Sequence, residues 1–200
     1  RGGAGEPVGA ADPPGVRACR RGLLERLDRT RAAIAHRRQL DPYKKVTFRG
    51  VTLDRRTRAA FLLMERRYRA VAPKKRGKLR IGQGSYSNGS MSGSTHAQGG
   101  AIDVMFAGLN PKQQRAVVKF GRLVGFAMWS RKDPKVWGYN NEHAHGILRG
   151  HRTASPAAKQ QVVAYDAGRD GLVSNLPDRE WRPKKKRRFS YIQGRPILGK

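Results

Sequence analysis

Cysteine and acidic residues are scarce in this chain, and long apolar runs are absent. The 200 residues include one cysteine, Cys19, which excludes an internal disulfide framework and a thiolate zinc cluster. No run approaches the roughly 18 apolar residues of a membrane span, because arginines interrupt every apolar stretch. The 24 glycines show no triplet period, so a collagen-like chain is excluded as well.

The few acidic residues leave a large positive charge. Lys and Arg number 43 against 14 Asp and Glu, which gives a formal net charge of +29 at pH 7. Such a charge predicts a polyanionic partner, and it leaves nucleic acid, anionic lipid and an anionic cell-wall polymer open. A chain of 200 residues is long enough for one domain with a buried core.

Composition marks off both ends of the chain. Residues 1–15 are rich in Gly, Pro and Ala, which predicts a flexible lead-in. Leucines at helical spacing predict an N-terminal helix within residues 16–42, and Asp41-Pro42 ends it. Residues 173–200 carry the run RPKKKRR and are expected to form an extended basic tail that binds a polyanion.

Short strands and helices are predicted between these segments. Alternating apolar residues in KKVTFRGVTL (44–53) indicate a hairpin. Further strands are expected near residues 79–81, 101–106, 126–130 and 142–148. Helices are expected from Asp54 to Pro73, and again where Asn110-Pro111 and Ser155-Pro156 supply a cap followed by proline.

Two loops draw attention as functional segments. The Gly- and Ser-rich stretch 82–100 runs directly into the apolar run AIDVMF, and a long loop between two strands is more often functional than a spacer. A second loop, RKDPKVWGYNN (131–141), leads into EHAHGIL. Three of the five histidines lie in or beside these two loops.

The spacing of His96, Asp103, Glu142 and His145 predicts a zinc site. His96 and Asp103 are separated by a Gly-Gly pair, and a tight turn there allows their side chains to converge. Two His and one Asp form a three-point zinc site that leaves the fourth position for water. Glu142 lies three residues before His145 and is placed to take the proton of that water.

The same residues resemble the zinc-binding pattern of the D-alanyl-D-alanine carboxypeptidase family (peptidase M15), which shares its fold with hedgehog signalling domains. That pattern is S-x-H-x-x-G-x-A-x-D followed by E-x-x-H, and the resemblance covers about residues 43–172. Every fixed position is matched in this chain, by Ser94, His96, Gly99, Ala101, Asp103, Glu142 and His145.

The resemblance implies a small α+β domain with a central antiparallel sheet and flanking helices. It implies zinc on His96, Asp103 and His145, with Glu142 as the catalytic base. The implied substrates are stem peptides of bacterial peptidoglycan. Anionic wall polymers are then the expected polyanionic partner. The expected location is the cell wall, the extracellular space or a bacteriophage, where virion partners are possible.

One departure concerns the group that holds the substrate carbonyl. The family often carries an S-G-Y-R segment before the first ligand, and its Arg has that role. Here the segment reads Gln83-Gly84-Ser85-Tyr86-Ser87 without an Arg, so Gln83, Tyr86 or His143 is left as the donor. Substrate contacts are therefore assigned to Gln83, Ser85, Tyr86, Ser94 and Trp137.

Several residues have a second interpretation. His143 is either a catalytic group that stabilises the transition state or a packed loop residue, and Trp137 lines the groove or packs in the core. His36 and His151 are expected to face solvent, and Cys19 to be a small buried residue. The competing function is a basic nucleic-acid-associated or virion structural protein with a structural or vestigial metal site.

Overall fold

The computed structural model describes residues 14–72, 77–87 and 94–198, which fall into two units. The first unit ends at Leu40 and contains helix α1 (Pro14–Gln39), as predicted. The lead-in expected over 1–15 lies almost wholly outside the described residues. Cys19 is exposed, so its predicted burial was wrong, because α1 is the only described element of its unit.

The second unit, from Asp41 on, begins with the predicted hairpin and helix. Strands β1 (Lys45–Phe48) and β2 (Val51–Asp54) pair antiparallel across a turn at Arg49-Gly50. Helix α2 (Arg55–Arg69) follows at once, because the Asp54 carboxylate caps it by accepting from the backbone N–H of Thr57. Its apolar side chains, which recur at helical spacing, are buried: Ala60, Phe61, Met64 and Tyr68.

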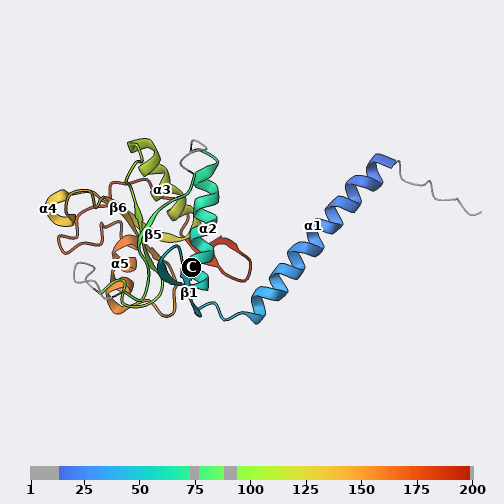
Figure 1. Ribbon diagram of the computed structural model, residues 1–200, viewed down its shortest axis with the longest axis horizontal. Coiled ribbons are helices and arrows are strands. Elements are labelled where there is room, and N and C mark those ends of the chain that lie inside the picture. The colour runs from blue at the N-terminus through green and yellow to red at the C-terminus, as the bar shows by residue number, and fades with distance from the viewer. Residues whose placement is uncertain (1–13, 73–76, 88–93, 199–200) are drawn as a thin grey trace, which may run out of the picture. The chain divides into compact units, whose positions relative to one another are not determined.

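A four-stranded antiparallel sheet forms the centre of this unit (Figure 1). Its strand order is β3-β4-β6-β5. The strands are β3 (Ile81–Gln83), β4 (Ala101–Met105), β5 (Phe126–Arg131) and β6 (His143–Leu148). The expected α+β class with a small antiparallel sheet therefore holds, while nothing in the fold alone identifies a family.

Three more helices connect and cover the strands. They are α3 (Pro111–Val124), α4 (Pro134–Trp137) and α5 (Pro156–Asp166). Asn110 and Ser155 cap α3 and α5 as predicted, each followed by a proline at the first helical position. Figure 1 shows α2 and α3 on one side of the sheet and α5 on the other.

The pleat of the sheet sorts side chains by the parity of their residue numbers. Even-numbered residues of β4, β5 and β6 pack into the main core with α2 and α3: Ile102, Val104, Phe126, Met128, Ala144 and Leu148. Odd-numbered residues face α5, and Ala101, Ala127 and Ile147 form a smaller cluster with it. Asp103 and His145 are also odd-numbered, so they lie on the α5 face.

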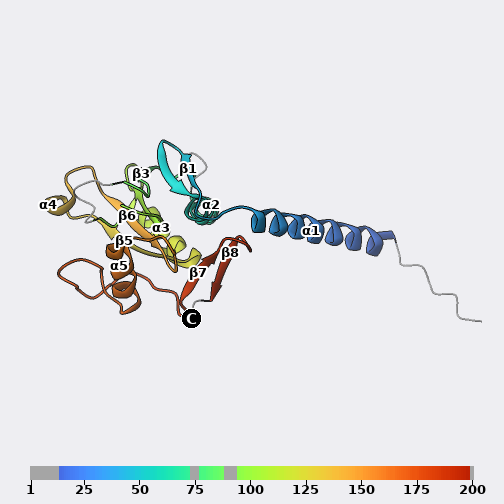
Figure 2. The same ribbon diagram turned by 90° about the horizontal axis from the view of Figure 1, so that it is seen from below.

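The C-terminal segment is not an extended tail over its whole length. Strands β7 (Arg187–Ser190) and β8 (Arg195–Leu198) form a hairpin that contacts α3 (Figure 2). Phe189 is 2% exposed and belongs to the main core. The prediction was wrong here because a single buried aromatic residue, rather than a periodic pattern, holds the hairpin to the domain.

His151 is 4% exposed, so its assignment to solvent was wrong. Its Nε2 lies 3.0 Å from Asp54 Oδ2 and its Nδ1 lies 3.3 Å from Thr153 Oγ1, so both ring nitrogens have partners. The ring fits against the Gly99-Gly100 pair, where a Cβ on Gly100 would meet His151 Cγ at 2.8 Å. His36 is exposed, as predicted.

Among the described residues, no helix combines the length and the apolar character needed to cross a bilayer.

The Asp54–His151 pair predicts a measurable contribution to stability. Burial raises the pKa of Asp54, but hydrogen bonds from His151 and Thr57 outweigh it and hold the pKa below its ordinary value. Asp54→Ala removes a helix cap and the carboxylate partner of the buried His151 Nε2, so we expect a loss of about 3 kcal/mol in the free energy of unfolding. Chemical denaturation measures the loss.

Asn110→Ala is the matched control, because Asn110 caps α3 without contacting a buried histidine. We expect it to reduce the free energy of unfolding by about 1 kcal/mol. Equal losses in the two variants would contradict a contribution from His151. The lowered pKa of Asp54 also sets a direction: its stabilisation is present above the unfolded pKa of the carboxyl and disappears as the pH falls through the folded value.

Candidate metal centre

One row of paired residues crosses the central sheet and carries the predicted site. Asp103 in β4 lies directly opposite His145 in β6, and His145 lies opposite Trp129 in β5. Gln83 in β3 is opposite Asp103. Directly paired residues of antiparallel strands point to the same face with Cβ atoms about 4.5–5.5 Å apart, so these side chains are neighbours on the α5 face.

His96 reaches this row from the loop that precedes β4. The loop is held against the segment that follows β3, because Ser87 N–H donates to His96 O at 2.9 Å and Tyr86 N–H donates to Gln98 O at 3.3 Å. His96 is 1% exposed. The predicted turn at Gly99-Gly100 is present, and Gly100 has a φ of +93°, which favours glycine.

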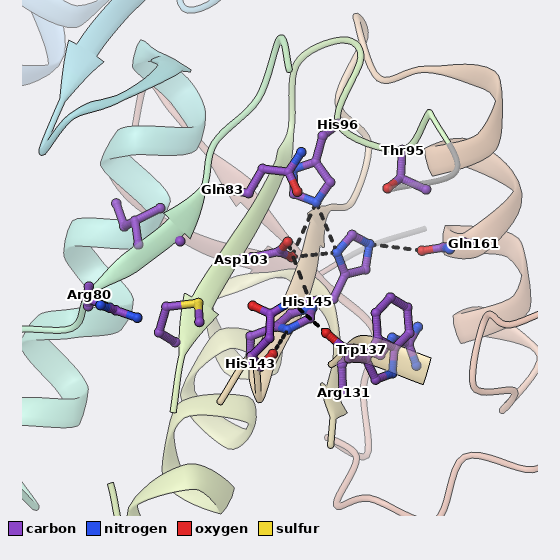
Figure 3. Close-up of a pocket in the computed structure, with 14 residues that line it drawn as sticks. Arg80, Gln83, Thr95, His96, Asp103, Arg131, Trp137, His143, His145 and Gln161 are labelled. Carbon is purple, nitrogen blue, oxygen red and sulfur yellow. Dashed lines mark hydrogen bonds and ion pairs between the residues drawn. The ribbon is translucent and has the colours of Figure 1, made fainter. Parts of the chain in front are cut away.

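Three side chains of this region converge, as Figure 3 shows. His145 Nδ1 lies 2.7 Å from Asp103 Oδ1, and His96 Nε2 lies 3.3 Å from the same oxygen. The two ring nitrogens are 3.2 Å apart. Ligands at about 2.0–2.1 Å in a tetrahedral zinc site are about 3.3 Å from one another, so the triangle has the dimensions of a metal site.

The outward nitrogen of each ring contacts a carbonyl oxygen. His96 Nδ1 lies 2.7 Å from the backbone oxygen of Gly84, and His145 Nε2 lies 3.0 Å from Gln161 Oε1. A carbonyl oxygen only accepts, so the outward nitrogens carry the protons and the inward nitrogens carry lone pairs. Three acceptors then face one another, and a cation between them relieves their repulsion.

The protonation states fit the same interpretation. Burial lowers the pKa of His145, which keeps its imidazole neutral at neutral pH. Burial works to raise the pKa of Asp103, but a proton held by His145 or His96 outweighs burial and keeps that pKa well below its ordinary value. A metal cation can take the place of that proton. Neutral imidazoles and an ionised carboxylate are the forms that bind metals, so these three buried residues could hold a metal ion.

A pocket of about 580 Å³ opens beside the three residues. Of the substrate contacts expected from the sequence, Gln83 and Trp137 line it. Ser85 is 1% exposed and donates to Ala101 O at 2.8 Å, so it supports β4 rather than the pocket wall. Tyr86 and Ser94 do not line the pocket, and Ser94 is exposed.

The two expected catalytic residues are placed differently. His143 lines the pocket, with Nδ1 at 2.7 Å from Asn141 O and Nε2 at 3.9 Å from Asp103 Oδ2. Glu142 is exposed and does not line the pocket. Glu142 immediately precedes β6, and side chains alternate along an extended chain, so it points away from the side of His143 and His145.

Several residues of the pocket were not predicted from the sequence, and two of them bear on its chemistry. Gln161 reaches His145 from α5, and Arg131 lines the pocket from the end of β5. No local sequence motif distinguishes Gln161 from other polar residues of a surface helix. Arg131 is one of 43 Lys and Arg residues in this chain, so nothing in the composition distinguishes it from the others.

Comparison of the chain with models of protein families, with curated proteins and with solved structures found no match in any of the three. The peptidase resemblance of the motif therefore stays a prediction.

The contact between Gln161 and His145 predicts the strength of metal binding. Gln161→Leu removes the acceptor that orients the imidazole, and we expect about 10–100-fold weaker zinc binding, measured by competition with a chelating dye. His145→Ala sets the lower limit, with no specific binding. Gln160→Leu is the control, because Gln160 is exposed and does not line the pocket. Equal affinities for the Gln161 and Gln160 variants would contradict the orienting role.

Proposed function

We propose that this protein is a zinc-dependent peptidase that cleaves stem peptides of bacterial peptidoglycan. The observation that carries the proposal is a buried His-Asp-His triangle of acceptors in the wall of an open pocket. A site that only stabilises a fold is closed by a fourth protein ligand, whereas this one faces free volume. The match of the sequence pattern to wall peptidases supplies the substrate class.

A zinc ion bound to His96, Asp103 and His145 supplies Lewis-acid activation of water and of the scissile carbonyl. The chain itself supplies orientation. Gln161 fixes the ring of His145, Gly84 fixes that of His96, and Trp129 stacks on His145 at an interplanar angle of 14°. These contacts hold both rings before a metal arrives, which reduces the reorganisation that binding requires.

His143 is the group that we assign to proton transfer. Its Nδ1–H donates to Asn141 O, which leaves the lone pair of Nε2 on the side of the pocket and of Asp103. The edge of this ring meets Trp137, with centroids 5.5 Å apart, which restrains it further. An imidazole held in this way can take a proton from water at Nε2 and return it to the leaving amine.

Glu142 is the base that the sequence pattern favours, and its place in the structure supports it less well. The side chain is exposed and outside the pocket, so a role in proton transfer requires the residue to turn toward it. The net charge of +29 is consistent with action on an anionic cell wall. The enzyme would then act outside the cell or as part of a phage.

Digestion of purified peptidoglycan tests the proposal. We expect zinc-loaded protein to release new peptide termini that mass spectrometry identifies, and a chelator to abolish the release. His143→Gln should keep zinc and lose about 10²–10⁴ in rate, while Glu142→Gln loses much less. The reverse order would return the base to Glu142. Absence of new termini from zinc-loaded protein would refute the proposed function.

A nucleic-acid-associated protein is the second candidate. The net charge of +29 favours this candidate, because Lys and Arg side chains bind nucleic acids by neutralising their phosphates. Binding to double-stranded DNA tighter than about 10⁻⁶ M at physiological salt, together with inactivity toward peptidoglycan, would support this candidate.

The basic run is predicted to bind the wall without taking part in cleavage. Removing the whole C-terminal segment is unsuitable as a test, because Arg122 bonds to Trp181 O at 2.8 Å and Phe189 lies in the core. Lys184, Lys185 and Lys186 are exposed and lie outside the pocket. Their joint replacement by Gln should weaken sedimentation with purified walls at low salt and leave soluble-peptide cleavage unchanged. Unchanged wall binding would place the interaction on other basic residues.

A further inference from the structure

Arg131 is a buried cation in the wall of the pocket. It is the last residue of β5, lies opposite His143 in β6, and is 4% exposed. Its odd number places it on the same face as Asp103 and His145, and Figure 3 shows it in the pocket with His143 and Trp137. The sequence motif assigned it no role.

Its contacts leave most of its donors without a protein acceptor. Nη2 donates to the backbone oxygen of Asp170 at 2.9 Å, and the guanidinium carbon lies 5.2 Å and 5.7 Å from the ring centres of Trp129 and Trp137. Among the described residues, no carboxylate forms an ion pair with it. A guanidinium has five N–H donors, so one carbonyl satisfies a small part of them.

Other buried arginines of the domain are paired more fully. Arg122 bonds to Asp178 at 2.8 Å, and Arg149 bonds to Asp166 at 2.8 Å. Arg56 donates to three backbone carbonyl oxygens, those of Gly150, Arg149 and Phe189. Arg131 alone among these four lines the pocket, which is also where its unused donors can meet a ligand.

Burial of this charge is unfavourable without an anion beside it. Burial lowers the pKa of Arg131 to about 10, although Asp170, Glu180 and Asp103 act in the opposite direction. The group is therefore still a cation at neutral pH. A buried charge that lacks an anionic partner destabilises a protein, and an anionic ligand that enters the pocket removes much of that penalty.

We propose that Arg131 binds a carboxylate of the substrate and so selects peptides that carry one near the scissile bond. This inference rests on the proposed peptidase function. Arg131 lies two residues along β5 from Trp129, and Trp129 lies opposite His145. Two residues of a strand span about 7 Å, so Arg131 is about that far along the sheet from the row that carries His145. That distance corresponds to about two residues of an extended peptide, so the carboxylate lies within about two residues of the cleaved bond.

The carboxylate has two possible sources, a free C-terminus or an acidic side chain. Two pairs of peptide probes separate them. Acetyl-D-alanyl-D-alanine and its C-terminal amide differ in the terminal charge. Acetyl-L-alanyl-D-glutamate amide and its glutamine counterpart differ in the side-chain charge.

Tryptophan fluorescence provides a readout that does not depend on turnover, since Trp129 and Trp137 both contact the Arg131 guanidinium. We expect the wild-type full chain to bind the acid of one pair about tenfold or more tighter than its amide. Arg131→Met should bring that ratio close to one, and Arg131→Lys should restore part of it. Lys132→Met, in the exposed neighbour outside the pocket, should leave the ratio unchanged.

Equal affinity of the wild-type protein for acid and amide in both pairs would overturn the inference, and this result needs no variant to fold. An unchanged ratio in Arg131→Met, with a melting curve like that of the wild type, would overturn it as well. Failure of the peptidase proposal gives a different result: acid-selective binding that depends on Arg131, with no peptide bond cleaved. Cleavage of acids and amides at equal kcat/KM would keep the peptidase and remove the role of Arg131.

Discussion

The direct pairing of Asp103 with His145 across β4 and β6 is the constraint on which the site depends. A slip of one residue in this register would turn Asp103 toward α2 and α3 and bring an apolar neighbour into the pocket. The buried even-numbered residues, such as Ile102, Val104 and Ala144, oppose the slip because they fill the core on the other face. Core packing therefore holds the carboxylate and the imidazole 2.7 Å apart.

The positions of protons and lone pairs around His96, Asp103 and His145 favour a cation, as the distances between these residues do. His96 and His145 each contact a carbonyl oxygen with the nitrogen that faces outward, which leaves lone pairs where the two rings meet Asp103. Such a group of acceptors is unfavourable when buried and favourable around a cation. The metal-binding interpretation thus depends on Gly84 and Gln161 as much as on the three ligands. His143, with the same arrangement of its two nitrogens, extends this polarity into the pocket.

Positive charge has three uses in this domain. Arg122 and Arg149 are internal links, and Arg122 ties the C-terminal segment to α3 through Asp178 and Trp181. Exposed lysines near residue 185 face solvent and suit a polyanionic surface. Arg131 belongs to neither group, because it is buried beside free volume with one carbonyl partner. Net charge alone does not distinguish these uses.

The sequence by itself determined most of the elements and the three candidate ligands. Alternation, capping residues and prolines are local signals, and the turn at Gly99-Gly100 requires only backbone freedom. Tertiary structure decided the rest. Burial of His151 depends on Asp54, almost a hundred residues away, and the place of Phe189 depends on α3. Spacing placed Glu142 near His145, whereas the pleat of β6 directs His143 and not Glu142 to the pocket. Gln161 and Arg131 join the site from α5 and β5 because sheet pairing and helix packing bring distant segments together, which no local pattern encodes.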